Sequence, residues 1–544
     1  MKPGRQSQCV LLSGARATAM SRTLVAVAVA ALPLAAVSQE AGDGGARPTI
    51  SIVPRVSVTE TFTNNALLQS GGKNTDLITQ VSPGIRISSN GGRIRGSLDY
   101  SLSEVIYANN SRGRQSQNAL NATGSIELVD NWAFLDLSGN IGQQAISAFG
   151  TQPGGGTVTN GNSTETSVFR MSPYIRGRLA GVADYEARYS LTSNSSQSTA
   201  VSNVNSNELA LKLTGVSGRP GSGWSVQADN QTIDYSAGRS TRSQRVNGQV
   251  NVPFSQNWGT YLKANHESNN FGAAAQQQDD FVALGANWTP NEELRVGVDK
   301  DTRGATGLTV NWAPSKRASL SIVRERRLFG DTHSIAAAYR TESTAWTFSD
   351  SRSAVTGQPA ATASASLYDL LTASFANGES DPTKREQYDA FLLANGIKPG
   401  AIAVGGFLSS SVSLQRQQQL SFALFGARST LAIVATRSTN TKLDTVSAAV
   451  DDFTTSAVVQ QTGFTVNLSH RLTPRSVLSL AAAQQRSSGS AGQPGTSLRS
   501  VNLNLSHQLT ADMTANVGAR RAVFDSSTAP YSETAVTGNL SVQF

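Results

Sequence analysis

The chain has 544 residues, of which 38% are hydrophobic and 6% aromatic, and a formal net charge of +8. Beyond the N-terminal stretch, no apolar run approaches the roughly 20 residues of a membrane helix, which excludes a bundle of such helices. The basic residues form no long block, so nothing indicates a nucleic-acid-binding tail.

The N-terminus has the pattern of an export signal. Two arginines precede an apolar stretch at 24–37, and the small residues Ala36 and Ser38 fit a cleavage site. The pattern predicts a signal peptide over 1–38 and a polar lead over 39–48; the alternative is an N-terminal membrane anchor.

From residue 49 to 544, short segments alternate between apolar and polar residues. In 183–191, Ala, Tyr, Ala, Tyr and Leu alternate with Asp, Glu, Arg and Ser. The last strand, 534–544, has the same period and ends on Phe544, which resembles the assembly signal of outer-membrane barrels. Each segment has about the 9–11 residues of a tilted membrane strand. Low mean hydropathy, −0.23, with this alternation is typical of a polar-lined, lipid-facing barrel.

Short turns and longer polar loops alternate along the chain. Outer-membrane barrels have the same arrangement, and their short turns are periplasmic. The count predicts an all-β fold: one large antiparallel transmembrane β-barrel of about 24 strands, range 20–26. The alternation fails at about 354–410, where 381–393 has a helical pattern, and a partly helical insertion is expected there. It is expected to cap the mouth, enter the lumen, or form a surface loop without function.

All six tryptophans lie at or near predicted short turns. Amphipathic aromatic rings gather at membrane interfaces, so these residues are expected to form a girdle. They are Trp132, Trp224, Trp258, Trp288, Trp312 and Trp346.

Two predicted strands joined at Gly181 carry a ladder of charges on one face. The turn places Arg178 opposite Asp184, Arg176 opposite Glu186, and a tyrosine opposite Arg188. Charges facing lipid are costly, so the ladder is expected to line the lumen. It either holds the register through cross-strand pairs or forms a polar wall for a hydrated glycan.

Catalytic and metal chemistry is not expected. The only cysteine, Cys9, falls in the predicted signal peptide, and none of the four histidines has metal-ligand spacing. The sequence has no G-x-S-x-G elbow and no phosphate-binding loop. We predict no enzyme activity, cofactor, metal or nucleic-acid partner.

An ordered set of motifs spans nearly the whole mature chain, at 52–54, 60–65, 76–85, 98–100, 127–136, 147–150, 381–396 and 407–409. Together they resemble the PEP-CTERM-system-associated outer-membrane protein family of Gram-negative bacteria. In that family the genes accompany exosortase and exopolysaccharide loci, and no catalytic residue is established.

The resemblance implies an outer-membrane barrel that acts as a conduit or accessory for exopolysaccharide export. The expected partners are outer-membrane lipid, the barrel-assembly machinery, exopolysaccharide and periplasmic export components. The alternatives are a general diffusion porin for small solutes and a non-transporting docking barrel for surface proteins.

Overall fold

The fold is described from a computed structural model. It describes residues 50–109, 112–155, 160–216, 222–236, 240–271, 276–356, 406–443, 451–490 and 492–544. Residues 49–544 form one compact unit. The predicted signal peptide and the lead lie outside the described residues, as does 357–405, most of the predicted insertion.

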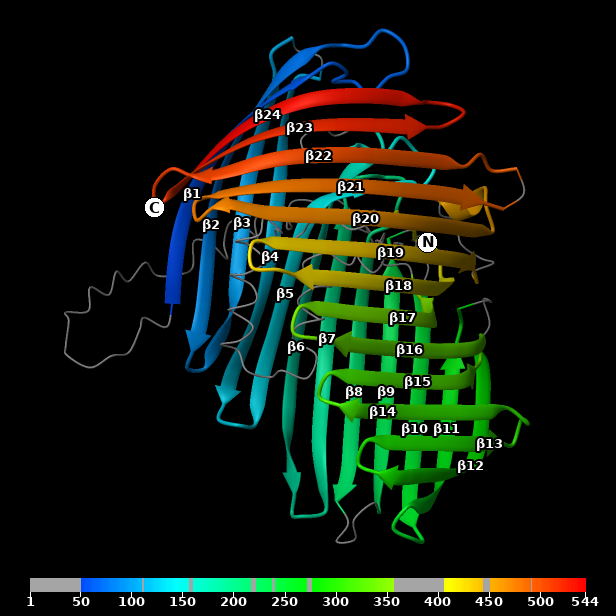
Figure 1. Cartoon of the computed structure of the whole chain (residues 1–544). Helices are drawn as coiled ribbons and strands as arrows, with labels where there is room; N and C mark the ends of the chain where they lie inside the picture. Colours follow the sequence, from blue (N-terminus) through cyan, green and yellow to red (C-terminus); the bar gives the residue numbers. More distant parts are fainter. Residues whose placement is uncertain are drawn as a thin grey trace, which may run out of the picture. The chain divides into compact units, whose positions relative to one another are not determined.

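The described residues contain 24 strands and one short 3-10 helix, η1 (Asp452–Thr454). The strands are β1 (Ile50–Thr63), β2 (Asp76–Gly91), β3 (Ile94–Tyr107), β4 (Arg114–Val129), β5 (Ala133–Ala145), β6 (Ser163–Leu179), β7 (Ala183–Ser196), β8 (Val204–Val216), β9 (Gly223–Tyr235), β10 (Ser240–Pro253), β11 (Trp258–Asn269), β12 (Gln277–Asn291), β13 (Leu294–Asp301), β14 (Thr306–Ser315), β15 (Ala318–Arg327), β16 (Gly330–Arg340), β17 (Thr344–Val355), β18 (Ser413–Phe425), β19 (Ser429–Lys442), β20 (Val458–Thr473), β21 (Ser476–Gly489), β22 (Thr496–Gln508), β23 (Met513–Asp525) and β24 (Tyr531–Gln543). Each pairs antiparallel with the next along the chain (Figure 1).

The sheet closes on itself where β24 meets β1. The two strands pair from Arg55 opposite Gln543 to Thr63 opposite Ala535. The backbone N–H of Phe544 adds a hydrogen bond of 2.9 Å to the Pro54 carbonyl. Closure leaves no unpaired strand edge, which a barrel in lipid requires. The predicted all-β barrel of about 24 strands is confirmed.

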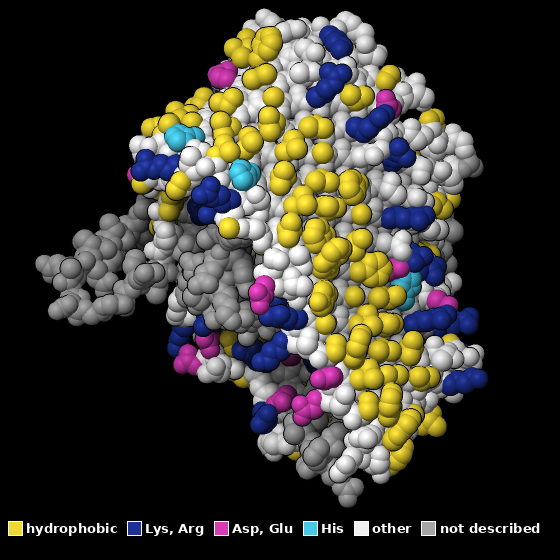
Figure 2. Space-filling model, in the orientation of Figure 1, with side chains coloured by type: hydrophobic (Ala, Val, Ile, Leu, Met, Phe, Trp, Pro, Cys, Tyr) yellow, Lys and Arg dark blue, Asp and Glu magenta, His cyan; other side chains and the backbone are white. Residues whose placement is uncertain are grey.

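The strand alternation separates two faces. Large apolar side chains such as Leu284 and Val517, which are 65% and 61% exposed, point away from the lumen, and charged ladders point into it. Figure 2 shows a band of hydrophobic side chains crossing one face, with Lys and Arg side chains on both sides of it. Such a band costs free energy in water and matches the apolar belt of an outer-membrane barrel. No helix among the described residues is long and apolar enough to cross a membrane.

The two ends of the barrel differ in their connections. The β6–β7 turn is tight: Ala180 and Gly181 both have positive φ, 40° and 75°, as a type I′ hairpin turn requires. Most of the longer connections join odd-numbered strands to the strands that follow them, although β15 and β16 are joined by a short turn, and we call this the long-loop end. At the first border of the predicted insertion, β17 continues through Ala354 and Val355. Residues 406–412, at its other border, are not helical.

Candidate functional site

The predicted charge ladder lies on the lumen side of β6 and β7. The register places Tyr174 opposite Arg188, Arg176 opposite Glu186, and Arg178 opposite Asp184, which are the facing pairs that the sequence predicts. The positive-φ turn at 180–181 sets this register, because a slip of one residue would turn the charges toward lipid.

The side chains of the ladder do not all pair with the residue they face. Arg178 binds Asp184 at 2.8 Å, as the register suggests. Arg188 instead joins Asp136 at 2.7 Å and Glu186 on its own strand at 3.2 Å. Arg176 lies over the ring of Phe134, 4.4 Å from its centroid. The ladder therefore extends onto β5, which the sequence analysis did not anticipate.

A second charged sector of the lumen was missed from sequence. Arg245 of β10 binds Glu325 of β15 at 3.1 Å, and Arg327 binds Glu267 of β11 at 2.8 Å. The sequence signal was partial: Lys263 lies between Leu262 and Ala264, whereas Glu267 lies between His266 and Ser268. Together the two sectors make a lumen wall whose charges largely compensate one another.

Three segments at the long-loop end fold together inside the barrel, and we call them the lumen bridge: residues 145–155, 406–412 and 451–457. Their apolar side chains form a buried cluster in which the rings of Phe407 and Phe453 lie 6.0 Å apart. Ala148 and Val459, a lumen-facing residue of β20, complete the cluster with no exposed surface.

The bridge joins opposite walls. The Leu408 N–H hydrogen-bonds the carbonyl oxygens of Ala145 and Ile146, both at 3.2 Å. Ala145 ends β5, and Leu408 lies five residues before Ser413, the start of β18. Ten strands separate β5 from β18 one way around the barrel and twelve the other way.

The contact implies that the walls approach each other at this end. Five residues reach about 18 Å, so the ends of β5 and β18 lie within about 25 Å. A round barrel of this strand number would be about 50 Å across at its backbone, from the strand spacing and tilt. The bridge thus narrows the mouth.

The first segment of the bridge also contacts the wall formed by β22–β24. Thr496 of β22 donates its hydroxyl to the Ala148 carbonyl at 3.3 Å, and Tyr531 of β24 donates to the Gln152 carbonyl at 2.6 Å. A side chain at Gly154 would collide with Ala522 of β23. This close approach explains why glycine occupies the position.

Two adjacent carboxylates hold the bridge together. Asp451 accepts hydrogen bonds from the hydroxyls of Ser409 and Ser411, at 2.8 and 3.1 Å, and from the Ser410 N–H at 3.1 Å. Asp452 binds the first segment instead.

Asp452, only 8% exposed, accepts from the Ser147 hydroxyl at 2.6 Å and the Ala148 N–H at 2.7 Å. Each carboxylate therefore holds a segment that comes from a different wall. Neither role could be predicted from sequence, because an Asp-Asp pair in a loop is usually only a solvated turn.

The bridge should tighten in acid. Burial raises the pKa of the Asp452 carboxyl, as does the charge of Asp451, while hydrogen bonds from Ser147 and Ala148 lower it; the net shift is upward. A raised pKa means that the closed state binds the proton more tightly than a released state, so protonation favours closure. The Ser147 hydroxyl can reverse and accept from the protonated carboxyl.

We expect the conductance of the reconstituted protein to fall as the pH is lowered from neutral toward the ordinary carboxyl range. Asp452→Asn should flatten this part of the profile, because it removes the titrating group. Current recordings on both proteins across this range check the expectation, and a wild-type profile as flat as that of the variant would contradict it.

The other predicted positions lie as follows. The six tryptophans are at the short-turn end, and five are well exposed; Trp224 is less so because it lies over Gly215. Trp258 and Trp288 pair across strands with ring centroids 6.0 Å apart. Phe544 is 74% exposed beside the β1–β24 seam. Ala36 and Ser38 lie outside the described residues.

The four histidines are dispersed over the strands. His470 and His507 each hydrogen-bond a serine hydroxyl at 2.8 Å, and His266 and His333 each bind an aspartate. Among the described residues, no group of three or more His, Cys, Asp or Glu side chains is placed to hold a metal ion.

No protein-family model and no curated protein matches the sequence. Among solved structures, the chain is similar to the FrpB iron transporter from Neisseria meningitidis, with 10% identity and a TM-score of 0.43, over 90% of this chain and 82% of that one. It is also similar to the siderophore receptor PirA from Pseudomonas aeruginosa, with 9% identity and a TM-score of 0.37, over 92% of this chain and 81% of that one. The chain is similar as well to the siderophore receptor PirA from Acinetobacter baumannii, with 9% identity and a TM-score of 0.39, over 91% of this chain and 80% of that one.

Similarities of this size carry no argument about substrate or mechanism. The strand pairing and the two faces of the sheet establish the fold by themselves: the chain is a closed, antiparallel 24-stranded β-barrel of the outer-membrane type.

Proposed function

We propose that this barrel is a passive outer-membrane conduit whose long-loop mouth is gated by the lumen bridge. The observation that carries the proposal is the bridge itself, which narrows a wide lumen through hydrogen bonds to two neighbouring carboxylates, Asp451 and Asp452. An outer-membrane barrel wide enough for a polymer needs such a closure, because an open lumen would admit harmful solutes.

The substrate class that we propose is a hydrated exopolysaccharide. Ion pairs such as Arg188–Asp136 and Arg327–Glu267 cancel most of the lumen charge while keeping the wall wet. A polymer moving along such a wall exchanges weak hydrogen bonds with water and side chains and meets no strong fixed charge. The motif resemblance to the PEP-CTERM-associated family supports export of this kind of polymer.

Deletion of the gene tests the substrate class. We expect loss of surface polysaccharide with unchanged uptake of small solutes, because the bridge bars the mouth to free diffusion. Complementation with the wild-type gene should restore the polysaccharide. Reduced solute uptake with normal polysaccharide would instead identify a general diffusion porin.

If the protein is instead a docking barrel that transports nothing, a third result is expected. Planar-bilayer recordings would then show no current, either for the wild type or after release of the bridge. Pull-down of exported surface proteins with the intact barrel would add positive support for that alternative.

A further inference from the structure

The outer face of the barrel carries arginines above the apolar band at the long-loop end. We call five of them the arginine row. One comes from each of β18, β19, β21, β22 and β23, and each shares its strand face with apolar residues nearer the membrane centre. They are Arg416, Arg437, Arg486, Arg499 and Arg521.

Strand registers place the row at one level. Arg437 is opposite Thr462, which is in turn opposite Arg486. On the next pair of strands, Arg499 is opposite Gln484, the outward residue that precedes Arg486 on β21. Arg521 is opposite Val501, the outward residue that follows Arg499 on β22. The row therefore follows the sheet around the barrel. Figure 1 shows on which side the long loops of these strands lie. In Figure 2, which has the same orientation, Lys and Arg side chains line that side of the hydrophobic band.

Acidic groups on this face do not neutralise the row. Arg416 binds Asp350 at 2.6 Å and Arg499 binds Asp525 at 2.5 Å. The other three arginines contact neutral side chains: Arg437 is 3.5 Å from Gln460, Arg521 is 3.3 Å from Thr534, and Arg486 is 3.0 Å from Gln484. Five arginines against two aspartates leave an excess of three positive charges.

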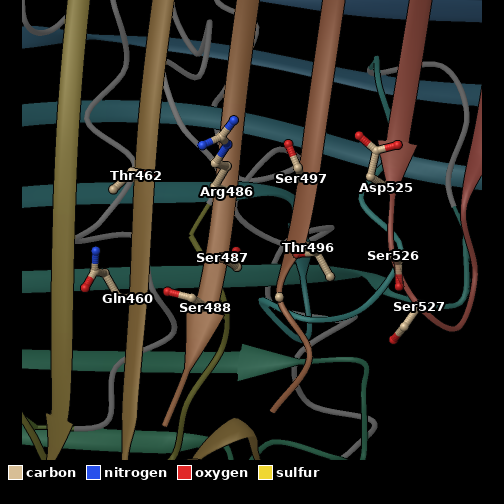
Figure 3. Close-up of a pocket in the computed structure, with 11 residues that line it drawn as sticks. Gln460, Thr462, Arg486, Ser487, Ser488, Thr496, Ser497, Asp525, Ser526 and Ser527 are labelled. Carbon is tan, nitrogen blue, oxygen red and sulfur yellow. The ribbon is translucent and has the colours of Figure 1, made fainter. Parts of the chain in front are cut away.

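The same level holds a groove of about 600 Å³. Thr462, Arg486, Ser497 and Asp525, which line it, come from the adjacent strands β20–β23 (Figure 3). Phe464, 48% exposed, lies two residues beyond Thr462 on the outward face. Two residues span about 7 Å along a strand, so the groove opens directly onto the apolar band.

We propose that the arginine row and its groove bind the phosphorylated headgroup of a glycolipid in the leaflet on the long-loop side. Guanidinium groups bind phosphate oxygens bidentately, and the hydroxyls that line the groove suit a sugar. The apolar surface just below would hold the acyl chains. A phosphorylated glycolipid therefore matches the surface part by part: its phosphate meets the arginines, its sugar the hydroxyls of the groove, and its acyl chains the apolar band. The proposal requires the barrel to stand in the outer membrane with its long loops outside, and it does not depend on the transported substrate.

The test uses the full chain in nanodiscs, with bisphosphorylated lipid A as the probe and lipid A without phosphates as its comparison. Arg437→Gln/Arg486→Gln/Arg521→Gln should lower the affinity for the phosphorylated probe tenfold or more. It should leave the weaker binding of the phosphate-free probe unchanged.

The matched control removes three charges at the short-turn end, with Arg428→Gln/Arg471→Gln/Arg475→Gln, and should bind the phosphorylated probe like the wild type. Heat-dependent gel mobility establishes that both variants are folded barrels. Equal affinity of the wild type for the two probes, an equal loss in both triple variants, or no loss in the first would overturn the proposal. The readout is lipid binding, so a negative result would not affect the proposed conduit function. Likewise, a negative result in the conductance tests would not affect the proposed lipid site.

Discussion

Replacing Asp451 and Asp452 together by alanine is expected to raise the conductance of the reconstituted barrel several-fold. The two carboxylates hold the segments at 147–148 and 409–411, which come from different walls. A methyl side chain accepts no hydrogen bond, so alanine removes the acceptors of both segments and leaves their buried donors without a partner. Hydrogen bonds to charged groups contribute about 1.5–3 kcal/mol each. A loss of about 3 kcal/mol from the closed state changes the closed-to-open ratio roughly 150-fold.

The control for this variant is Asp512→Ala, which removes a carboxylate from an exposed turn at the other end of the barrel. It should leave conductance unchanged in the same bilayers. A double variant that conducts like the wild type, although folded, would show that the bridge does not govern passage through the mouth.

The second large effect is expected at the seam that closes the barrel. Glu533 of β24, only 1% exposed, binds Arg520 of β23 at 2.8 Å and accepts from the Thr63 hydroxyl of β1 at 2.9 Å. Glu533→Ala leaves the buried guanidinium without its counter-charge, which costs about 3–5 kcal/mol. Urea unfolding in detergent, followed by gel mobility, should show a markedly lower midpoint.

Two further variants separate this effect from a general loss of charge. Arg520→Met with Glu533→Leu removes both charges and should be close to the wild type, since apolar replacement of a buried pair is often neutral. Asp184→Ala breaks the exposed pair with Arg178 and should change the midpoint little. A Glu533→Ala protein as stable as the Asp184→Ala protein would contradict the role of the seam.

The barrel could be predicted from sequence because its signals are local. Each strand shows its two faces in its own alternation, and the Ala180–Gly181 turn sets the register of a whole hairpin. The same local reasoning extends to Lys263 of β11, which lies between Leu262 and Ala264, but not to Glu267, which lies between two polar residues. The ion pairs of the second charged sector, such as Arg245–Glu325, join strands that are not neighbours, so the pattern of one hairpin does not predict them.

The lumen bridge could not be predicted in the same way. Its segments have no periodicity, and Ser147 meets Asp452, which lies 305 residues further along the chain. The motifs at 147–150 and 407–409 carried part of the family resemblance, but nothing in them indicates that they meet inside the barrel. Only closure of the sheet brings β5 and β18 to facing positions.

The most direct test of gating by the bridge is a reversible lock. The Ser147 hydroxyl and the Asp452 carboxylate are 2.6 Å apart, and Cys9 is the only natural cysteine. In Ser147→Cys/Asp452→Cys, a disulfide would replace this contact. We predict low conductance after oxidation and a several-fold rise in the same channels when a reductant is added. Identical currents in the two states, with disulfide formation established by mass spectrometry, would contradict gating by the bridge.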